Sequence, residues 1–484
     1  MATTTSDSRF VSTSREETQI VSASKTLEID HLVDGQKIGP LVLRIVVLSL
    51  LVQCADGFDL AAMSYAAPEI IRAWGIKAQA MGPVFNAGLV GMAVGGPLLG
   101  YIGDHYGRRV AILISTLVYG LFTLMMVGAH GLQALLLLRF ISGVGLGGLL
   151  PNTVALNAEY APRRFRATLI IIMFMGLAVG GILPSVVATS LLGRYGWQAF
   201  FFVGGVGPLL LAVALFALLP ESIKFLVAKG RNERATRLAS RLRPDLAIDH
   251  HTTLVMSTSR QGVNSFSPGL LFADGLGALT LLVWVLFSAA LIVNFFVNSW
   301  MPTLFRANGL SSDQTAITQA AYYLGGICGG LVISRLIDRW GVLPIMVYFL
   351  VGGPVVASIG TQGLSHAALT VAVFFTGATV LGSQLGMNAV TGMIYPTSIR
   401  SKGAGWASAI GRFASIGGPT IGAWLIAHKT PMPRLFLVPA IPMVIGGIAA
   451  AGLLYLCFRR FRGMRLSETR AAATEVAPHS SPRN

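Results

Sequence analysis

The stretch "LVLRIVVLSLLVQCADGFDLAAMSYAAPEI" (41–70) decides the fold, because it is apolar over a length that can cross a lipid bilayer. A helix of about 20 apolar residues spans the hydrocarbon core. This stretch nevertheless carries Asp56 and Asp59, and a carboxylate in a lipid-embedded helix costs roughly 2.5–3.5 kcal/mol on insertion scales. Because both residues are costly to insert, we expect them to have a role in the function of the protein.

The whole chain has the composition of an integral membrane protein. Of its 484 residues, 54% are hydrophobic and 12% are charged, whereas soluble domains average about 25% charged residues. The 56 glycines suit membrane helices, which pack closely through small residues. Apolar runs predict an all-α protein with twelve transmembrane helices, at residues 41–70, 81–103, 110–129, 132–157, 167–192, 198–219, 276–305, 314–337, 343–361, 366–392, 403–427 and 434–458.

The net charge of +16 reflects membrane topology rather than a nucleic-acid partner. If the N-terminus is placed in the cytoplasm and each of the twelve spans crosses the membrane once, most of the 36 Lys and Arg residues lie on the cytoplasmic side. Lys and Arg are enriched in the cytoplasmic loops of membrane proteins. We therefore predict a multi-pass protein of the inner (plasma) membrane with both termini cytoplasmic.

The sequence indicates no cofactor, metal site or enzymatic activity. Cys54, Cys328 and Cys457 lie in apolar runs without a pair spacing, and the eight His residues are scattered. Neither a nucleotide-binding loop nor a catalytic nucleophile motif is found. The polar, Ser- and Thr-rich residues 1–40 are predicted to be a disordered cytoplasmic tail.

An internal repeat organises the rest of the chain. "GYIGDHYGRR" (100–109) is echoed by "SRLIDRWG" (334–341), and "PRRFRAT" (162–168) by "PTSIRSKG" (396–403), each at an offset of 234 positions. A duplicated six-helix unit predicts two bundles that face each other across a central cavity, with the binding site near the midplane. The predicted divisions are a bundle at 41–219, a cytoplasmic linker at 220–275, a bundle at 276–458 and a cytoplasmic tail at 459–484.

These motifs resemble those of a known transporter superfamily. "GYIGDHYGRR", "LRFISGVGLGG" (138–148) and "PESIKFL" (220–226) resemble motifs of the major facilitator superfamily. "DGFD" (56–59), "NSWMPTLF" (298–305), "EYAPRRFRA" (159–167) and "GRFASIGGP" (411–419) are similar to the aromatic acid:proton symporters of that superfamily. The resemblance covers residues 40–460 and departs from the loop motif at His105, where Arg is usual. That change is either a neutral substitution or a source of pH sensitivity.

The function implied by the resemblance is import of a small aromatic carboxylate, such as a hydroxybenzoate, together with protons. Because no ATP-binding motif is found, the energy is expected to come from an ion gradient, and the chain is expected to act as a monomer by alternating access. Two alternatives remain. One is transport of another organic anion or a sugar acid. The other is a receptor that senses its ligand without moving it, which the short, featureless tails disfavour.

Four charged residues are candidates for proton coupling. Asp56 and Asp59 lie three residues apart on one helix face, and two close carboxylates removed from water cannot both ionise cheaply, so one is expected to carry a proton. Arg139 is expected to face this pair, and Glu159 to pair with Arg163 or Arg166 in a gate. The alternatives are that one of the aspartates only caps an irregular turn near Gly57, or that these charged residues form permanent ion pairs.

Arg412 is the candidate for holding the substrate carboxylate, because a fixed cation within a span needs an anion and its planar fork suits a carboxylate. A structural pair or a packing role is the alternative. Other candidates in the spans could bind a hydroxyl or stack on a ring, although helix packing is the commoner use of such residues. They are Asn294, Asn298, Trp300, Tyr322, Tyr323, Gln384, Asn388, Trp406 and Phe413.

The loops that follow the second and eighth predicted helices are expected to control the conformational cycle rather than any chemistry. Their acidic and basic residues could hold helix ends together, and their glycines allow tight turns. The residues concerned are Gly100, Gly103, Asp104, Gly107, Arg108, Arg109, Asp338 and Arg339.

Overall fold

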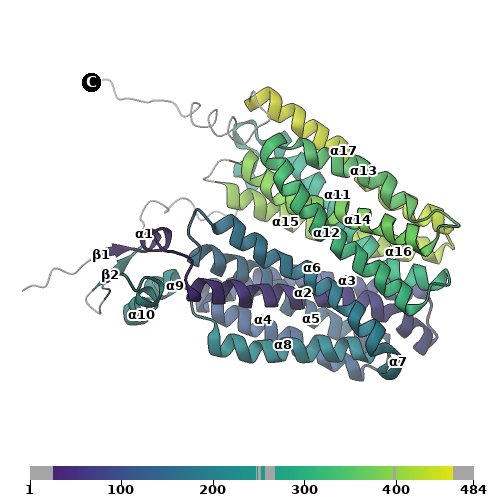
Figure 1. The fold of residues 1–484 in the computed structure, drawn as a ribbon, viewed down its shortest axis with the longest axis horizontal. Coiled ribbons are helices and arrows are strands. Elements are labelled where there is room, and N and C mark those ends of the chain that lie inside the picture. Colours follow the sequence, from purple (N-terminus) through teal and green to yellow (C-terminus); the bar gives the residue numbers. More distant parts are fainter. Residues whose placement is uncertain (1–25, 247, 249–251, 257–267, 396–398, 462–484) are drawn as a thin grey trace, which may run out of the picture.

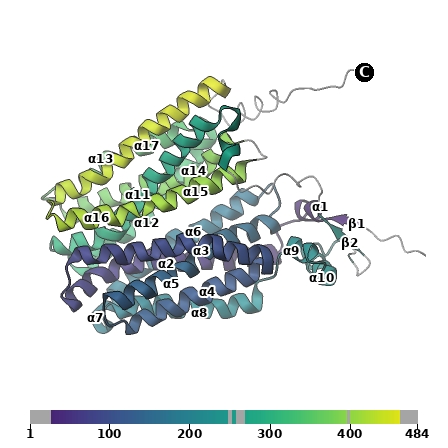
Figure 2. The ribbon, with the colours of Figure 1, turned by 180° about the vertical axis from the view of Figure 1, so that it is seen from behind.

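The structure, a computed structural model, describes residues 26–246, 248, 252–256, 268–395 and 399–461. Its helices form two bundles that lie side by side (Figures 1 and 2). The first bundle comprises α2 (Pro40–Trp74), α3 (Met81–Tyr106), α4 (Arg108–Met125), α5 (Leu132–Tyr160), α6 (Arg166–Ser190), α7 (Leu192–Tyr195) and α8 (Gln198–Leu218). The second comprises α11 (Gly277–Ala307), α12 (Ser312–Trp340), α13 (Leu343–Ser358), α14 (His366–Ile394), α15 (Arg400–Ser415), α16 (Gly417–Ala427) and α17 (Met432–Phe461).

The twelve predicted spans all coincide with helices. Within the described residues, ten helices are long and apolar enough to cross a membrane. The span predicted at 343–361 is a shorter apolar helix, α13, of 16 residues. The span predicted at 403–427 is divided into α15 and α16.

The break between α15 and α16 follows from one proline. Pro419 has no N–H to donate to the carbonyl of Ser415, four residues earlier, and its ring crowds that carbonyl. Helix α15 ends at Ser415, and the hydroxyl of Ser415 bonds back to the carbonyl oxygen of Arg412 at 2.5 Å. Arg412 therefore lies in the last turn before a helix interruption.

The repeat seen in the sequence is also present in the packing. A Cβ on Gly91 of α3 would lie 2.1 Å from the carbonyl oxygen of Phe140 of α5. A Cβ on Gly325 of α12 would lie 1.9 Å from the carbonyl oxygen of Phe374 of α14. Both members of the second pair are 234 positions beyond those of the first, so the two bundles use the same close helix contact.

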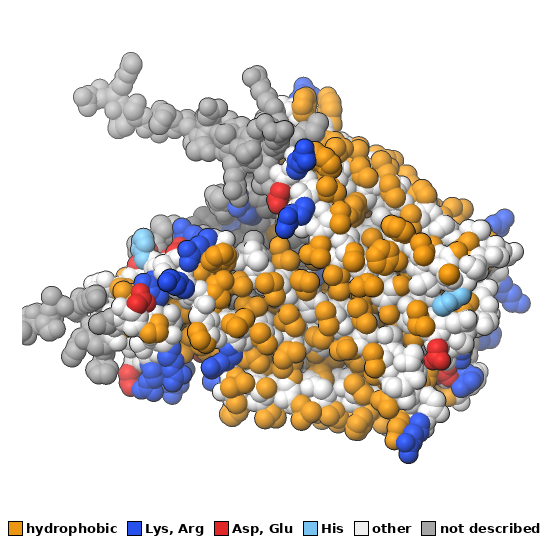
Figure 3. All heavy atoms as spheres, in the orientation of Figure 1, with side chains coloured by type: hydrophobic (Ala, Val, Ile, Leu, Met, Phe, Trp, Pro, Cys, Tyr) orange, Lys and Arg blue, Asp and Glu red, His pale blue; other side chains and the backbone are white. Residues whose placement is uncertain are grey.

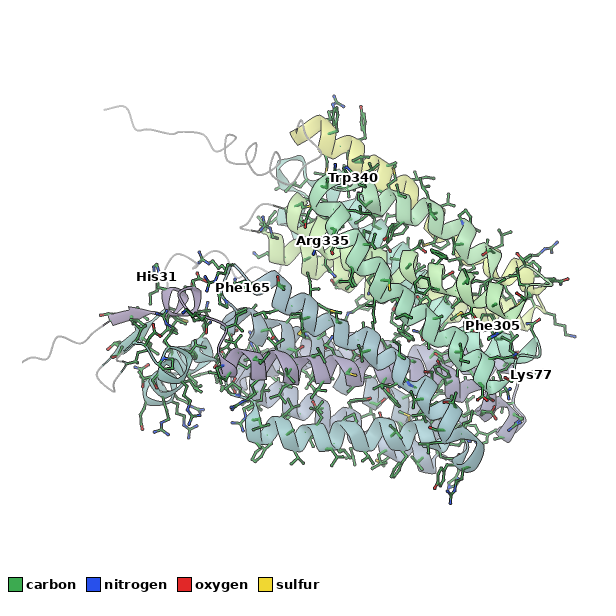
Figure 4. All side chains as sticks on the ribbon, in the orientation of Figure 1. His31, Lys77, Phe165, Phe305, Arg335 and Trp340 are labelled. Atoms are coloured by element: carbon green, nitrogen blue, oxygen red, sulfur yellow. The ribbon has the colours of Figure 1, made fainter. Side chains whose placement is uncertain are left out.

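The bundles meet at one end and diverge toward the other (Figures 1 and 2). Lys77 and Phe305 lie at the end where they meet, which we call the far end, and Phe165 and Arg335 lie at the opposite end, where the bundles are apart (Figure 4). At the far end the carboxylate of Glu69 pairs with Arg72 at 2.8 Å and with Arg306 of the second bundle at 3.1 Å. The elements that connect the two bundles in the sequence lie at the opposite end, which we call the linker end.

The linker end carries a small cap on the first bundle. Strand β1 (Thr26–Glu28) pairs in parallel with β2 (Thr253–Val255), next to α1 (Ile29–Asp34), α9 (Ile223–Ala228) and α10 (Asn232–Leu242). Asp30 pairs with Lys224 at 2.6 Å, and Asp34 pairs with Arg163 at 3.0 Å. The predicted disordered tail of residues 1–40 is therefore wrong from Thr26 onward, because contacts with the linker order that part; residues 1–25 lie outside the described residues.

Candidate substrate and proton site

A buried ion pair joins α2 to α5. Nη1 of Arg139 donates to both carboxylate oxygens of Asp59, each at 2.7 Å, and the two residues are 5% and 2% exposed. Gly88 of α3 leaves room for the guanidinium, because a Cβ there would lie 3.0 Å from Nε of Arg139. The structure thus places Arg139 against the first helix, where the sequence predicted a partner for it.

Asp56 lies within electrostatic reach of a different arginine. It is 5% exposed, and its Oδ1 has no hydrogen-bond partner among the described residues. Its charge attracts that of Arg412 on α15, in the other bundle. No carboxylate lies within ion-pair distance of the Arg412 guanidinium in the part of the chain that the structure describes.

A polar network crosses the interface between the bundles. The hydroxyl of Ser64 donates to Oδ1 of Asn298 at 3.2 Å, and Nδ2 of Asn298 donates to the hydroxyl of Tyr323 at 2.5 Å. Tyr322 donates to Oδ1 of Asn294 at 2.7 Å. Asn294, Asn298, Tyr322 and Tyr323 were candidates from the sequence, whereas Ser64 was missed because serine is common within apolar helices.

A small pocket lies where the ion pair meets this network. It is lined by Asp59, Arg139, Phe85, Phe295, Asn298 and Ser299, from α2, α3, α5 and α11. Its volume of about 20 Å³ is close to that of one water molecule, and ligand pockets occupy roughly 300–1,000 Å³. In this conformation the pocket is therefore too small for an organic ligand.

Trp300 does not face this pocket. Its side chain is fully buried, its indole N–H donates to the carbonyl oxygen of Pro419 at 3.1 Å, and its ring packs edge-on against Phe85. A Cβ on Gly422 would lie 2.2 Å from the indole. The geometry therefore favours a packing role for Trp300 over the predicted stacking on a substrate ring.

The remaining predicted contacts are scattered. Asn388 is exposed and donates to the carbonyl oxygen of Gln384 in its own helix at 3.3 Å. Phe413 is 62% exposed, and Trp406 lies beside Trp284 with ring centroids 6.4 Å apart. None of these residues lines the pocket at the ion pair.

Gln319 of α12 is a polar residue that the sequence analysis missed. Its side chain is fully buried, and neither amide atom has a hydrogen-bond partner among the described residues. A buried amide without a partner is unusual and needs an explanation. Its position one turn from Tyr322 and Tyr323 makes it a further candidate for a polar contact with the substrate.

A charged cluster at the linker end joins the loop after α3 to two other elements. Arg108 pairs with Asp104 at 2.5 Å and lies 3.7 Å from a carboxylate oxygen of Glu159. Glu159 also accepts a hydrogen bond from the hydroxyl of Ser222. The expected pair of Glu159 with Arg163 or Arg166 is not formed, because Arg163 pairs with Asp34 and Arg166 donates to the carbonyl oxygen of Ala161.

Glu221 completes this cluster and was not predicted. It accepts hydrogen bonds from the backbone N–H groups of Arg109 at 3.2 Å and Ser222 at 2.9 Å. Burial raises the pKa of Glu221 above its ordinary value, and these hydrogen bonds oppose the shift. The sequence shows Glu221 in "PESIKFL", but the contact with Arg109 joins residues that are 112 positions apart.

Two glycines of the loop are fixed by this packing. Gly107 has a φ of +112°, and a Cβ there would lie 2.3 Å from Oε2 of Glu221. A Cβ on Gly103 would lie 1.9 Å from Oδ1 of Asn152. Gly100 differs, because a Cβ at that position would meet nothing within 4 Å.

The repeated loop in the second bundle forms no equivalent cluster. The guanidinium of Arg339 lies over the ring of Trp340, 5.6 Å from its centroid. Within the described residues Asp338 forms no ion pair, so the predicted contact of Asp338 with Arg339 is not found in this conformation. No group of three or more His, Cys, Asp or Glu residues could hold a metal ion in the part of the chain that is described.

Comparisons with known proteins agree on one family. The model of the sugar (and other) transporter family matches residues 44–461. The 4-hydroxybenzoate transporter PcaK of Acinetobacter baylyi is 32% identical over 431 residues, which cover 88% of this chain and 93% of that protein. The gallate transporter of Pseudomonas putida is 31% identical over 433 residues, covering 87% and 94%.

The fold has counterparts among solved structures. The xylose transporter XylE of Escherichia coli, in a partially occluded inward-open conformation, matches with a TM-score of 0.64 at 17% identity, covering 87% of this chain and 99% of that one. XylE is a proton:xylose symporter of the major facilitator superfamily, and at this identity the match concerns the fold alone. Sequence motifs, fold and family model agree, and the chain belongs to the sugar (and other) transporter family of the major facilitator superfamily, as a multi-pass membrane transporter and not an enzyme.

Proposed function

We propose that this transporter imports a small aromatic carboxylate together with protons. The observation that carries the proposal is the arrangement of charges in the spans, where Asp59 pairs with Arg139 and Asp56 lies within electrostatic reach of Arg412 in the other bundle. The relatives support the class of substrate, because 4-hydroxybenzoate, gallate and benzoate are all aromatic carboxylates.

Charge balance gives a reason for coupling to protons. Asp56, Asp59, Arg139 and Arg412 together are neutral when all four are ionised. A substrate carboxylate would bring one uncompensated negative charge into a desolvated site, which is costly. A proton bound at Asp56 restores neutrality and releases Arg412 to bind the substrate. One proton for each carboxylate is therefore the minimum stoichiometry.

The proposed binding mode assigns separate tasks to the two bundles. Arg412 would hold the carboxylate as a planar fork, at the end of a helix where a positive charge is favoured. Asn298 and Tyr323 would bind a ring hydroxyl, since both already take part in a hydrogen-bond network beside the ion pair. Asp59 would accept a proton when its ion pair with Arg139 breaks during the cycle.

The energy for accumulation would come from the proton gradient. With one proton for each carboxylate the step is electroneutral, so the pH difference alone drives it, at about 1.4 kcal/mol per pH unit. A second proton would add the membrane potential, at roughly 2.3 kcal/mol per 100 mV. The response to potential therefore reports the number of protons.

Alternating access would occur by rocking of the two bundles. We place the linker end in the cytoplasm, because the basic residues gather there (Figure 3) and such residues favour that side. The bundles are in contact at the far end and apart at the linker end. The described conformation would therefore be the one that faces the cytoplasm, in a protein of the inner membrane. We take a single chain as the working unit.

Uptake into proteoliposomes tests this proposal. Purified protein would be supplied with labelled benzoate, 4-hydroxybenzoate, gallate, a sugar acid and xylose, with and without an inward pH gradient. Accumulation of an aromatic acid above its equilibrium level only with the gradient supports the proposal. Preference for the sugar acid, uptake that ignores the gradient, or binding without uptake contradicts it.

A further inference from the structure

A pocket at the linker end lies outside the proposed transport site. Its volume is about 710 Å³, and it is bounded by the ends of α2, α4 and α8 and by the segment that contains α9 and α10. These helix ends are where the membrane spans stop, which is the level of lipid headgroups. The substrate site proposed above uses none of the residues that line this pocket.

Six arginines line the pocket, among apolar side chains. The arginines come from the N-terminal turns of α2 and α4 and from the segment around α10, and they are Arg44, Arg109, Arg231, Arg234, Arg237 and Arg241. Helix α10 presents Arg234, Arg237 and Arg241 because its opposite face, with Ala235, Ala239 and Leu242, is buried. Figure 3 shows the corresponding concentration of basic side chains beside the apolar surface of the bundle.

Most of this positive charge is not compensated by protein. Arg237 pairs with Glu233 at 2.9 Å, and Arg109 donates to the carbonyl oxygen of Phe216. In the described part of the chain the others have no carboxylate within ion-pair distance. Glu221 is the one carboxylate in the lining, and it accepts backbone hydrogen bonds instead. Such a concentration of guanidinium groups favours an anion, and phosphate suits their geometry.

The pocket continues into apolar surface. Val110 of α4 and Phe216 and Leu218 of α8 line it and are 37%, 69% and 46% exposed. Further along the same helices, Leu117 and Val213 are 48% and 68% exposed. A ligand that fills both parts would have a phosphate at one end and long apolar chains at the other.

We propose that this pocket binds an anionic phospholipid, with its phosphate among the arginines of α10 and its acyl chains along α4 and α8. Basic pockets between spanning helices are suited to such headgroups. A free phosphate would share the arginine chemistry but would leave the apolar surface unused. Binding here would hold α10 against the ends of the spans in the first bundle.

Native mass spectrometry of the full-length protein tests this proposal. The protein would be titrated with phosphatidylglycerol and, separately, phosphatidylcholine and inorganic phosphate. The variant Arg234→Gln/Arg241→Gln should bind phosphatidylglycerol roughly tenfold more weakly or worse, since each basic residue near a membrane surface contributes to attraction. The control Arg335→Gln/Arg459→Gln removes the same charge from the second bundle and should bind as the parent does.

Three outcomes would overturn the proposal. Equal weakening in both double variants would show general surface attraction. Inorganic phosphate that displaces the phospholipid, or binds as tightly, would show a site for a free anion. Equal binding of phosphatidylcholine would show that the charge is irrelevant. Arg234→Lys/Arg241→Lys keeps the charge and should recover most of the binding. If the glutamine variant unfolds, the lysine variant becomes the test, and its loss of binding would count against a phosphate site.

Discussion

The hydroxyl of Ser64 donates to Oδ1 of Asn298 at 3.2 Å, and the two residues are 234 positions apart. That separation is the offset of the internal repeat, so each residue is the other's counterpart in the two bundles. Counterparts related by a two-fold axis can touch only where the axis passes. The contact therefore places the pseudo-symmetry axis between α2 and α11, where Ser64 meets Asn298.

The same offset relates Arg72 to Arg306, and both pair with the carboxylate of Glu69. At position 303, the counterpart of Glu69, the second bundle carries Thr303. One carboxylate thus pairs with two symmetry-related arginines. The contact between the bundles at the far end is therefore asymmetric, although the two bundles are repeats of one another. We expect that rocking of the bundles must break this contact.

Closure of the far end can be tested by linking Asn86 to Thr420, which join α3 to α16 through a 2.8 Å hydrogen bond. The variant Asn86→Cys/Thr420→Cys, with the native cysteines replaced by serine, would be treated with a short bifunctional thiol reagent. Uptake should fall at least tenfold and return when the link is reduced. Each single cysteine variant should keep its uptake after treatment. Full uptake by the linked protein would mean that the far end need not open.

Two glycines of the loop motif make a matched test of packing. Asn152, which a Cβ on Gly103 would meet, is fixed by hydrogen bonds to the carbonyl oxygens of Leu99 and Gly148 at 3.1 and 2.8 Å. Gly103→Ala should therefore cost about 1–3 kcal/mol through overpacking. Gly100→Ala adds a methyl to open space in a helix and should be neutral or stabilising by up to about 1 kcal/mol. Thermal unfolding in detergent measures both, and equal losses would be the contrary result.

The fold was largely predictable from the sequence. Hydropathy is a local property, so the apolar runs identified the spans, and the offset between Asp104 and Asp338 identified the repeat. The break after Ser415 was missed, although "SIGGP" (415–419) carries its signal in Pro419. The order of residues 26–40 was missed because it depends on β2 and on Lys224, far along the chain.

The site was only partly predictable. A buried arginine needs an anion, so the partnership of Arg139 with the Asp pair could be inferred from the residue types. Which carboxylate each arginine faces depends on how the bundles meet. Trp300 illustrates the limit, because its sequence context is the same whether it contacts a substrate or, as found, packs between α3 and α16. Glu221 likewise acquires its role through contacts distant in sequence.

The Asp59–Arg139 pair should be needed both for stability and for coupling. Asp59→Asn leaves a buried arginine without its anion, which costs about 3–5 kcal/mol, and it also removes a proton acceptor. Asp59→Asn/Arg139→Gln should recover much of the thermal stability but not the accumulation driven by a pH gradient. The readouts are thermal unfolding and uptake by proteoliposomes. Gradient-driven accumulation in Asp59→Asn at the level of the parent would contradict the assignment.

Stability at the linker end should depend on pH through Glu221. Burial raises its pKa above the ordinary value of 4.5, so its contribution to stability is fully present below that value and is lost as pH rises through the raised pKa. Glu221→Gln stays neutral throughout. The melting temperature of the parent minus that of Glu221→Gln should therefore fall as pH rises above 4.5. A difference for Glu221 that is independent of pH would refute the explanation.

Arg412 should determine the preference for an acid over its neutral amide. Its guanidinium lies within electrostatic reach of Asp56 of the other bundle and in the last turn of α15, where a helix end favours a cation. A substrate carboxylate can replace Asp56 as its partner once Asp56 is protonated, whereas an amide cannot. The parent should therefore bind an aromatic acid much more tightly than the corresponding amide. Arg412→Lys keeps the charge but loses the planar fork, so binding of the acid should weaken about tenfold.

The decisive comparison is the ratio of the two affinities in Arg412→Ala. If Arg412 contacts the carboxylate, this ratio should fall close to one, because the acid loses its partner and the amide loses little. If Arg412 only supports the fold, both affinities should fall together and the ratio should persist. Arg434→Ala, which removes an exposed cation from α17, serves as the control and should keep the ratio of the parent. A correctly inserted Arg412→Ala protein that still prefers the acid by the same factor would move the carboxylate to Arg139, the arginine that pairs with Asp59.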